Sequence, residues 1–177
     1  MTAEAAPALK AGVFEPPRLA PEFALRGSDG GELKLSRYRG RMVLLVFGFT
    51  HCPEVCPTTL ATLAQARKSL GSEGEAVQVI YVTVDPERDD MARIKQYLAA
   101  FDPAFIGGTG KPEVLAAVRK DYGVIAKKYE QPGANYGMNH STSVFLIDRE
   151  GKLRAMMPYG HEAKDFVHDL KLLLAAK

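Results

Sequence analysis

Cysteine is scarce in this chain, because its 177 residues include only Cys52 and Cys56. A disulfide between them would close a very short loop, worth about 2 kcal/mol in the chain-entropy model, against roughly 4 to 5 kcal/mol for a loop near 100 residues. A chain of this length can also bury an adequate core without a covalent crosslink. We therefore interpret the pair as a working dithiol rather than a structural disulfide.

The sequence also lacks long apolar runs and concentrated charge. No uninterrupted apolar stretch reaches the roughly 18 residues that a membrane-spanning helix needs. Lys and Arg number 23 against 21 Asp and Glu, and the basic residues form no dense cluster. Because nucleic-acid binding usually requires a concentrated positive field, we expect no nucleic-acid partner. The 46% of hydrophobic residues and 25% of charged residues are typical of a globular domain.

Residues 1–20 are rich in Ala and Pro and lack the basic start and long apolar core of a secretory signal. We interpret them as a flexible or extended lead-in to one domain that spans residues 21–177. Two origins stay open for this lead-in. It is either a cytosolic start or, as we prefer, a segment downstream of a removed anchor or signal.

The hydrophobic pattern predicts an α/β fold. Continuous apolar runs at residues 41–49 and 77–84 are typical of central strands that are covered on both faces. Apolar residues at helical spacing follow Pro57, Asp89 and Pro112, and a last helix is expected from about Glu162. Strands that alternate with helices in this way indicate a parallel α/β arrangement.

Three hairpins are predicted beside these elements. Residues 23–25 and 32–35 flank an Asp-Gly turn, and residues 142–147 and 153–157 flank Asp-Arg-Glu-Gly. Residues 122–136 are interpreted as a hairpin-like insertion in which Val124, Ala126 and Tyr129 point inward.

The two cysteines lie where the first central strand gives way to a helix. Such a junction exposes reactive groups, and the free N–H groups of a helix N-terminus stabilise a thiolate. Each cysteine precedes a proline, which disfavours the α conformation, so we predict a loop between them with Cys56 at the helix cap and Pro57 at the first helical position. Cys52 should be the more exposed. In such a loop the sulfurs can close to a disulfide or open around a metal.

Four histidines could add a third metal ligand. His161 and His168 fall on or beside the last helix and are expected at the surface, and His51 is expected to point away from the neighbouring Cys52. His140 precedes the strand at residue 142, in a loop that the fold should bring beside the strand–helix junction. A lone loop histidine is nevertheless more often a polar surface group than a ligand, so the residues alone leave its role open.

Three sequence blocks resemble the Sco/SenC family, copper-handling relatives of thioredoxin that serve cytochrome c oxidase assembly. They are FGFTHCPEVCP at residues 47–57, YVTVDPERD at 81–89 and YGMNHSTSVFLID at 136–148. The resemblance extends from about Pro21 to the carboxyl terminus. It implies a thioredoxin-like α/β fold with a central mixed sheet, an N-terminal β-hairpin and a hairpin-like insertion before the last two strands.

The resemblance implies a copper site for Cu(I) or Cu(II) with Cys52, Cys56 and His140 as ligands. Two soft thiolates favour Cu(I), and an imidazole gives a mixed set that also accepts Cu(II). Zinc is a competitor, but structural zinc normally has four protein ligands, and Met138 more often fills space than binds metal. Asp85 is either a turn or cap residue before Pro86 or, as the resemblance implies, a supporting residue near the dithiol.

The resemblance implies a copper metallochaperone that delivers copper to the dinuclear copper centre of cytochrome c oxidase, with the copper-bearing subunit as partner. The alternative is a thiol–disulfide oxidoreductase that reduces the cysteines of that centre before metal loading. In that case Cys52 would attack and Cys56 would resolve the mixed disulfide. We regard enzyme activity as open and secondary to metal binding.

The family resemblance also implies a compartment. We expect a periplasmic or intermembrane-space location, with a membrane anchor in the full-length protein that is absent from this chain. Periplasmic copper carriers or thiol reductants are further expected partners, and we expect a monomer.

Overall fold

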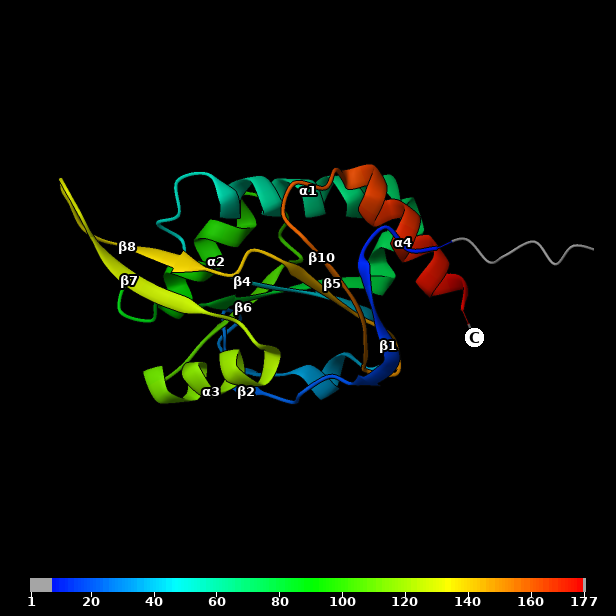
Figure 1. The fold of residues 1–177 in the computed structure, drawn as a ribbon, viewed down its shortest axis with the longest axis horizontal. Coiled ribbons are helices and arrows are strands. Elements are labelled where there is room, and N and C mark those ends of the chain that lie inside the picture. The colour runs from blue at the N-terminus through cyan, green and yellow to red at the C-terminus, as the bar shows by residue number, and fades with distance from the viewer. Residues whose placement is uncertain (1–7, 177) are drawn as a thin grey trace, which may run out of the picture.

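A computed structural model describes residues 8–176, which form an eight-stranded sheet and a separate two-stranded hairpin (Figure 1). The order in the large sheet is β1-β10-β9-β4-β5-β6-β2-β3, and β7 pairs with β8. The strands are β1 (Gly12–Leu19), β2 (Ala24–Gly27), β3 (Glu32–Lys34), β4 (Met42–Gly48), β5 (Val77–Thr83), β6 (Ile106–Thr109), β7 (Ala126–Gln131), β8 (Ala134–His140), β9 (Val144–Ile147) and β10 (Lys152–Met157).

The sheet is mixed, because β4, β5 and β6 run parallel while the other pairs are antiparallel. Helices cover both of its faces (Figure 1). Their bounds are α1 (Val55–Ser69), α2 (Met91–Ala99), α3 (Pro112–Tyr122) and α4 (Ala163–Ala175), with short 3-10 helices at Leu35–Tyr38 and Gly71–Ala76. The predicted α/β fold, with a central mixed sheet, the hairpin β2–β3 and the inserted hairpin β7–β8 before β9 and β10, is confirmed.

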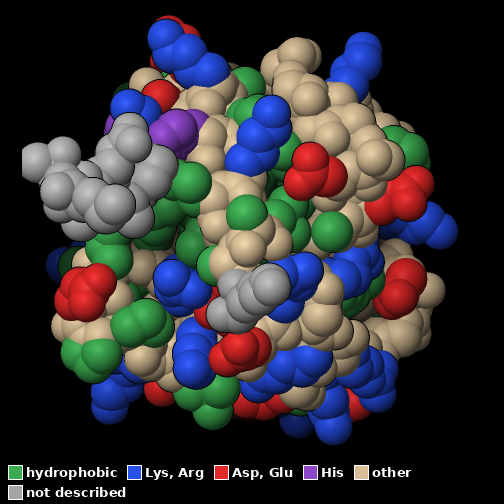
Figure 2. Space-filling view, turned by 90° about the vertical axis from the view of Figure 1, so that its right-hand side faces the viewer, with side chains coloured by type: hydrophobic (Ala, Val, Ile, Leu, Met, Phe, Trp, Pro, Cys, Tyr) green, Lys and Arg blue, Asp and Glu red, His purple; other side chains and the backbone are tan. Residues whose placement is uncertain are grey.

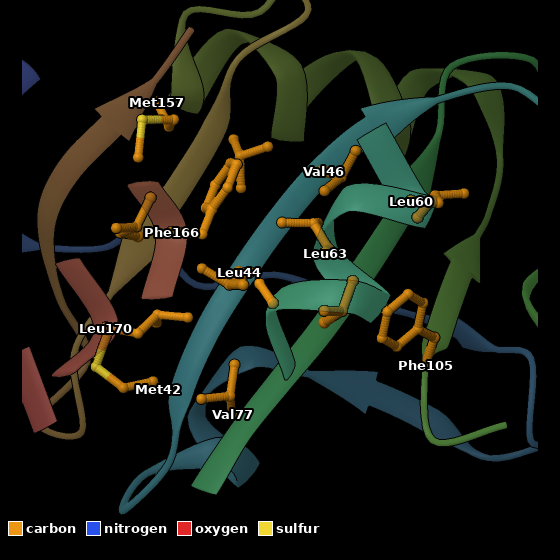
Figure 3. Packing of buried hydrophobic residues seen from close by; sticks show 14 of the residues in the cluster. Met42, Leu44, Val46, Leu60, Leu63, Val77, Phe105, Met157, Phe166 and Leu170 are labelled. Carbon is orange, nitrogen blue, oxygen red and sulfur yellow. The ribbon is translucent and has the colours of Figure 1, made fainter. Parts of the chain in front are cut away.

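Two hydrophobic clusters hold the layers together. Successive side chains along β4 point to opposite faces of the sheet. Met42, Leu44 and Val46 therefore belong to the cluster under α1, α2 and α4. Val43 and Leu45 belong to the cluster under α3. Figure 3 shows Leu60 and Leu63 of α1 packed over β4 in the first cluster. Full burial of one such leucine contributes about 1.5–3 kcal/mol, so this packing fixes the start of α1 relative to the end of β4.

Residues 12–19 of the predicted flexible or extended lead-in are extended and belong to the sheet, because they form β1 and pair with β10, whereas residues 1–7 of that lead-in lie outside the described residues. The pairing is interrupted between Val13 and Arg18. Pro16 and Pro17, which have no backbone N–H to donate, lie in this interruption and therefore break no hydrogen bond of the sheet. Just before β1, the buried carboxylate of Asp169 accepts hydrogen bonds from the backbone N–H groups of Lys10 and Ala11 at 2.7 and 2.9 Å. This carboxylate fixes the start of the strand to α4.

Strand β6 was not predicted, because two of its four residues are glycines. Packing explains both glycines. A Cβ on Gly107 would lie 2.2 Å from Ile94 Cγ2 of α2, and a Cβ on Gly108 would lie 2.7 Å from Leu33 Cδ2 of β3. Close approach of neighbouring elements therefore requires residues that weaken the strand signal in the sequence.

The inserted hairpin extends further along the chain than predicted, and His140 is the last residue of β8 rather than a loop residue. Tyr129 does not point inward, because 44% of its surface is exposed. Its ring instead lies over Gly137 on the opposite strand, where a Cβ would come within 2.2 Å of the ring carbon Cζ. The glycine makes room for a cross-strand contact that the alternating pattern alone did not reveal.

Among residues 8–176, no helix combines the length and the apolar character needed to cross a membrane. The face in Figure 2 carries both basic and acidic side chains, with Lys and Arg the more frequent in its lower half. This mixture agrees with the formal net charge of +2.

Candidate metal centre

The two cysteines lie at the junction of β4 and α1 with different exposure. Cys52 is half-buried and its backbone N–H donates to Phe49 O at 3.1 Å, which closes the turn after the strand. Cys56 is 2% exposed. Both are free thiols, and the predicted difference in exposure between them is confirmed.

The prediction that Cys56 caps the helix is wrong. Helix α1 begins at Val55 with Glu54 as its cap residue, so Cys56 is already in the first turn and Pro57 follows it there. The first four N–H groups of a helix have no acceptor within it, so a proline at this position interrupts no hydrogen bond. The bias of a residue before proline against the α conformation is outweighed here by the packing of α1.

Three metal-binding side chains converge at this junction. The sulfurs of Cys52 and Cys56 and a ring nitrogen of His140 all lie within 4.8 Å of one another. Cys56 Sγ is 3.5 Å from His140 Nε2, and the backbone N–H of Cys56 donates to Cys52 Sγ at 3.4 Å. Metal bonds of about 2.0–2.3 Å to sulfur and nitrogen require donor atoms about 3.5–4 Å apart, so this spacing suits a single metal ion.

The orientation of His140 leaves one ring nitrogen free for a metal. Its Nδ1 lies 2.7 Å from the carbonyl oxygen of Ser141, and because a carbonyl can only accept, Nδ1 carries the proton and donates. The other nitrogen, Nε2, then has a lone pair directed at Cys56 Sγ. The ring of Phe49 meets the imidazole edge to face, with centroids 5.6 Å apart, and holds the ring plane. Such partners fix the tautomer and the direction of a ligating histidine.

The two thiols have opposite acidities. The hydrogen bond from the Cys56 thiol holds the pKa of Cys52 well below its usual range despite partial burial, and the backbone N–H groups of Cys56 and Glu54 act in the same direction. The same hydrogen bond, together with burial, raises the pKa of Cys56. In the metal-free protein, Cys52 is therefore the thiolate and Cys56 is its proton donor.

This difference predicts the pH dependence of alkylation. Only the thiolate reacts with iodoacetamide, so a lowered pKa keeps Cys52 reactive in mildly acidic solution. We expect the alkylation rate of Cys52 to stay nearly constant between about pH 6 and 8, where the rate of an ordinary thiol with a pKa near 8.5 rises about tenfold per pH unit. Peptide mapping by mass spectrometry after timed quenching measures each site. A tenfold rise per unit at Cys52 would contradict the assignment.

Gly48, the last residue of β4, makes room for the buried cysteine. A Cβ at this position would lie 2.8 Å from Cys56 Sγ and 2.9 Å from the hydroxyl oxygen of Tyr81. Both atoms therefore occupy the space that any other residue would fill.

We expect Gly48→Ala to lower the free energy of unfolding by about 1–3 kcal/mol through overpacking and to displace the Cys56 sulfur. Chemical denaturation measures the stability, and Cu(I) competition measures the effect on the site. Gly40→Ala is a control for glycine replacement, because nothing lies within 4 Å of a Cβ there, although its φ of 90° adds backbone strain. Copper affinity that falls no further in Gly48→Ala than in Gly40→Ala would refute the displacement.

Asp85 is fully buried after β5 and bonds to neither cysteine nor to His140 among the described residues. Its carboxylate accepts from Arg88 Nε at 2.5 Å and from the hydroxyl of Tyr136 on β8 at 2.5 Å. Arg88 also stacks on the Tyr136 ring, 3.7 Å from its centroid, and donates to its backbone oxygen at 3.1 Å. We call these three side chains, Asp85, Arg88 and Tyr136, the latch, because they join the hairpin that carries His140 to the loop after β5.

Sequence reasoning missed Tyr136 and Arg88 as members of this arrangement. Both lie inside the three blocks that carry the family resemblance, at the start of the third block and near the end of the second. A tyrosine and an Asp-x-x-Arg pair in separate blocks gave no sign of mutual contact, since the contact depends on how the hairpin folds back.

Asp89 holds the other side of the junction. Its buried carboxylate accepts from the backbone N–H of Thr50 at 3.0 Å, from the Thr50 hydroxyl at 2.5 Å and from the Thr83 hydroxyl at 2.8 Å. The residue thereby ties the segment before Cys52 to the end of β5. His51 is exposed, and its ring lies within 4.8 Å of the carboxylates of Asp85 and Asp89, whose oxygens already accept hydrogen bonds.

The two remaining histidines are not part of the cysteine cluster. His161 pairs with Asp165 at 3.1 Å, and His168 pairs with Asp169 at 2.9 Å. Each side chain is about one third exposed, which partly agrees with the predicted surface position.

Comparison with known proteins places this arrangement among its relatives. The SCO1/SenC family model matches residues 13–175. The mouse protein named "Protein SCO2 homolog, mitochondrial" is 32% identical over 158 residues, which cover 88% of this chain. The match spans only 62% of the mouse protein's own length.

Two solved structures share the fold closely. ScoI from Bradyrhizobium japonicum, solved with copper bound, is 34% identical, with a TM-score of 0.80 over 88% of this chain and 99% of that one. The apo Sco1 protein from Thermus thermophilus is 36% identical, with a TM-score of 0.84 over 96% of this chain and 99% of that one. The thioredoxin-like architecture that the resemblance implied is therefore confirmed.

Proposed function

Because the chain belongs to the SCO1/SenC family, we propose that it binds copper through Cys52, Cys56 and His140 and delivers it to the dinuclear copper centre of cytochrome c oxidase. The convergence of these three side chains carries the proposal. It brings a histidine from an inserted hairpin within 3.5 Å of a buried cysteine on another element. A disulfide exchanger has no need of a metal-directed imidazole at that position.

The donor set suits copper in both oxidation states. Two thiolates bind Cu(I) strongly, and the imidazole adds a ligand that Cu(II) also accepts. Among the described His, Cys, Asp and Glu side chains only three converge with the two cysteines included, whereas structural zinc normally takes four ligands in a closed tetrahedron. The similar ScoI of Bradyrhizobium japonicum was solved with copper bound, which supports the same cargo here.

A three-donor site also suits a carrier, because a ligand of the recipient can join before a ligand of the donor leaves. Cys52 is the accessible donor, whereas Cys56 is buried beneath it. We propose that transfer begins at the Cys52 side, where an incoming cysteine of the oxidase subunit can approach the ion. Copper then moves through a shared intermediate without being released to water.

Transfer to the soluble copper-binding domain of the oxidase subunit tests this function. The reduced protein is loaded with one equivalent of Cu(I) and mixed with the apo domain, whose copper content is measured after separation. We expect transfer from the wild type and from a His161→Ala control, and clearly less from His140→Ala under the same competing chelator. Equal transfer from all three proteins would disprove the proposed ligand set.

The second candidate function is reduction of the recipient's disulfide, which the unequal thiols favour. The Cys52 thiolate would attack a sulfur of that disulfide and release one partner thiolate. Cys56, after losing its proton, would then attack Cys52 Sγ, giving a Cys52–Cys56 disulfide and a fully reduced partner. Two electrons pass from this protein to the partner.

His140→Ala separates the two activities. Reduction of the partner needs only the cysteines, so a variant that reduces the partner but does not load copper would show that both activities exist. A variant that retains copper loading while losing reduction would reverse these roles.

We propose a location on the periplasmic or intermembrane-space side of a membrane, where the oxidase subunit would meet this domain. The mouse relative is named as mitochondrial, which supports the second of these two locations, the intermembrane space. Protease protection of the full-length protein in spheroplasts or mitoplasts tests the side of the membrane. Digestion only after the inner membrane is lysed would exclude this location.

A further inference from the structure

A buried hydroxyl without a hydrogen bond lies beside the proposed copper site. Tyr81 is on β5, its side chain is 0% exposed, and its hydroxyl oxygen has no hydrogen-bond partner within the described part of the chain. Burial of an unpaired hydroxyl costs about 1–3 kcal/mol, so such a group usually has a partner in some state of the protein.

The position of the hydroxyl identifies that partner. Tyr81 oxygen and Cys56 Sγ lie 2.9 and 2.8 Å from the point where a Cβ on Gly48 would stand. Both atoms thus share the small space above the end of β4. The sulfur of a neutral thiol is only a weak acceptor, so it offers the hydroxyl no strong hydrogen bond.

We propose that Tyr81 is a positioning residue of the copper site, whose hydroxyl donates a hydrogen bond to the Cys56 thiolate when copper is bound and thereby favours Cu(I) over Cu(II). This inference rests on the proposed copper site. Binding of a metal removes the thiol proton and leaves a full thiolate beside the unpaired hydroxyl. A charged acceptor forms a stronger hydrogen bond than a neutral one.

The preference for Cu(I) follows from the electron density on sulfur. A hydrogen bond to a ligating thiolate withdraws density that would otherwise stabilise the more highly charged ion, and hydrogen bonding around such a sulfur tunes the potential of copper sites. Loss of a partner of this kind typically changes metal affinity by 10- to 100-fold. A tenfold loss of preference for Cu(I) corresponds to about 59 mV for one electron.

Tyr81→Phe tests the proposal, because it removes one oxygen and keeps the ring. We expect the Cu(II)/Cu(I) potential to fall by at least the equivalent of a tenfold change, and the sulfur-to-Cu(II) charge-transfer band to move to longer wavelength. The melting temperature of the metal-free variant should be unchanged or higher, because the hydroxyl forms no hydrogen bond with any described residue. A merely structural role for the hydroxyl would instead lower that temperature.

Tyr97→Phe is the matched control. Tyr97 neighbours Tyr81, with ring centroids 6.0 Å apart, and its buried hydroxyl oxygen also lacks a partner within residues 8–176. An unchanged potential and band in Tyr81→Phe would overturn the inference, as would equal shifts in both variants. If the wild type binds no copper, both the proposed function and this inference are overturned. If the wild type shows a normal copper band and Tyr81→Phe has the same potential and band, only the inference is overturned.

Discussion

Cys52→Ser and Cys56→Ser are each expected to weaken Cu(I) binding by about three orders of magnitude, or about 4 kcal/mol. Cu(I) is a soft ion, so a hydroxyl is a poor substitute for a thiolate. His140→Ala should have a smaller effect on Cu(I), because both thiolates remain, and a larger effect on Cu(II), for which imidazole is a preferred ligand.

Competition with a chromophoric Cu(I) chelator under strictly reducing conditions measures these affinities. His168→Ala provides a control, since its ring pairs with Asp169 outside the cysteine cluster. Serine is close to cysteine in size, so circular dichroism should show folded variants. Retention of wild-type affinity by both serine variants would exclude the dithiol as the copper site.

Asp89→Ala is expected to lower the free energy of unfolding by about 3 kcal/mol. The buried carboxylate accepts three hydrogen bonds, two from Thr50 and one from Thr83, and its removal would leave all three donors without that acceptor in the interior. Because the residue ties the segment before Cys52 to β5, the loss should also loosen the approach to the dithiol.

The neighbouring aspartate supplies the control for this prediction. Asp90 caps α2 from an exposed position by accepting from Arg93 N at 2.8 Å, so Asp90→Ala should cost only about 1 kcal/mol. Urea denaturation of both variants gives the comparison. Equal losses in the two would mean that Asp89 acts as no more than a second helix cap.

The fold was predictable wherever burial leaves a clear pattern in the sequence. β4 and β5 are buried on both faces, so their apolar runs identified them directly. β6 gave no such signal because α2 and β3 approach it too closely for side chains at Gly107 and Gly108. β1 was obscured by prolines, which fit only because the pairing with β10 is interrupted where they occur.

The candidate site was predictable in part. Cys52 and Cys56 are close in sequence, and the strand–helix junction around them follows from the hydrophobic pattern. His140 came from the family resemblance, because its approach to Cys56 depends on how a remote hairpin folds. Tyr81 was interpreted as an ordinary core aromatic, and only the structure shows that its hydroxyl lies beside a cysteine and lacks a hydrogen-bond partner among residues 8–176.

The latch has a thermodynamic consequence, because it joins the hairpin of His140 to the sheet that positions the cysteines. A metal ion that bridges His140 and the cysteines would strengthen the same connection, so latch closure and copper affinity are linked by one coupling free energy. Each must then favour the other by the same factor. Slower amide exchange along β7 and β8 in the copper-loaded protein would report that reciprocity.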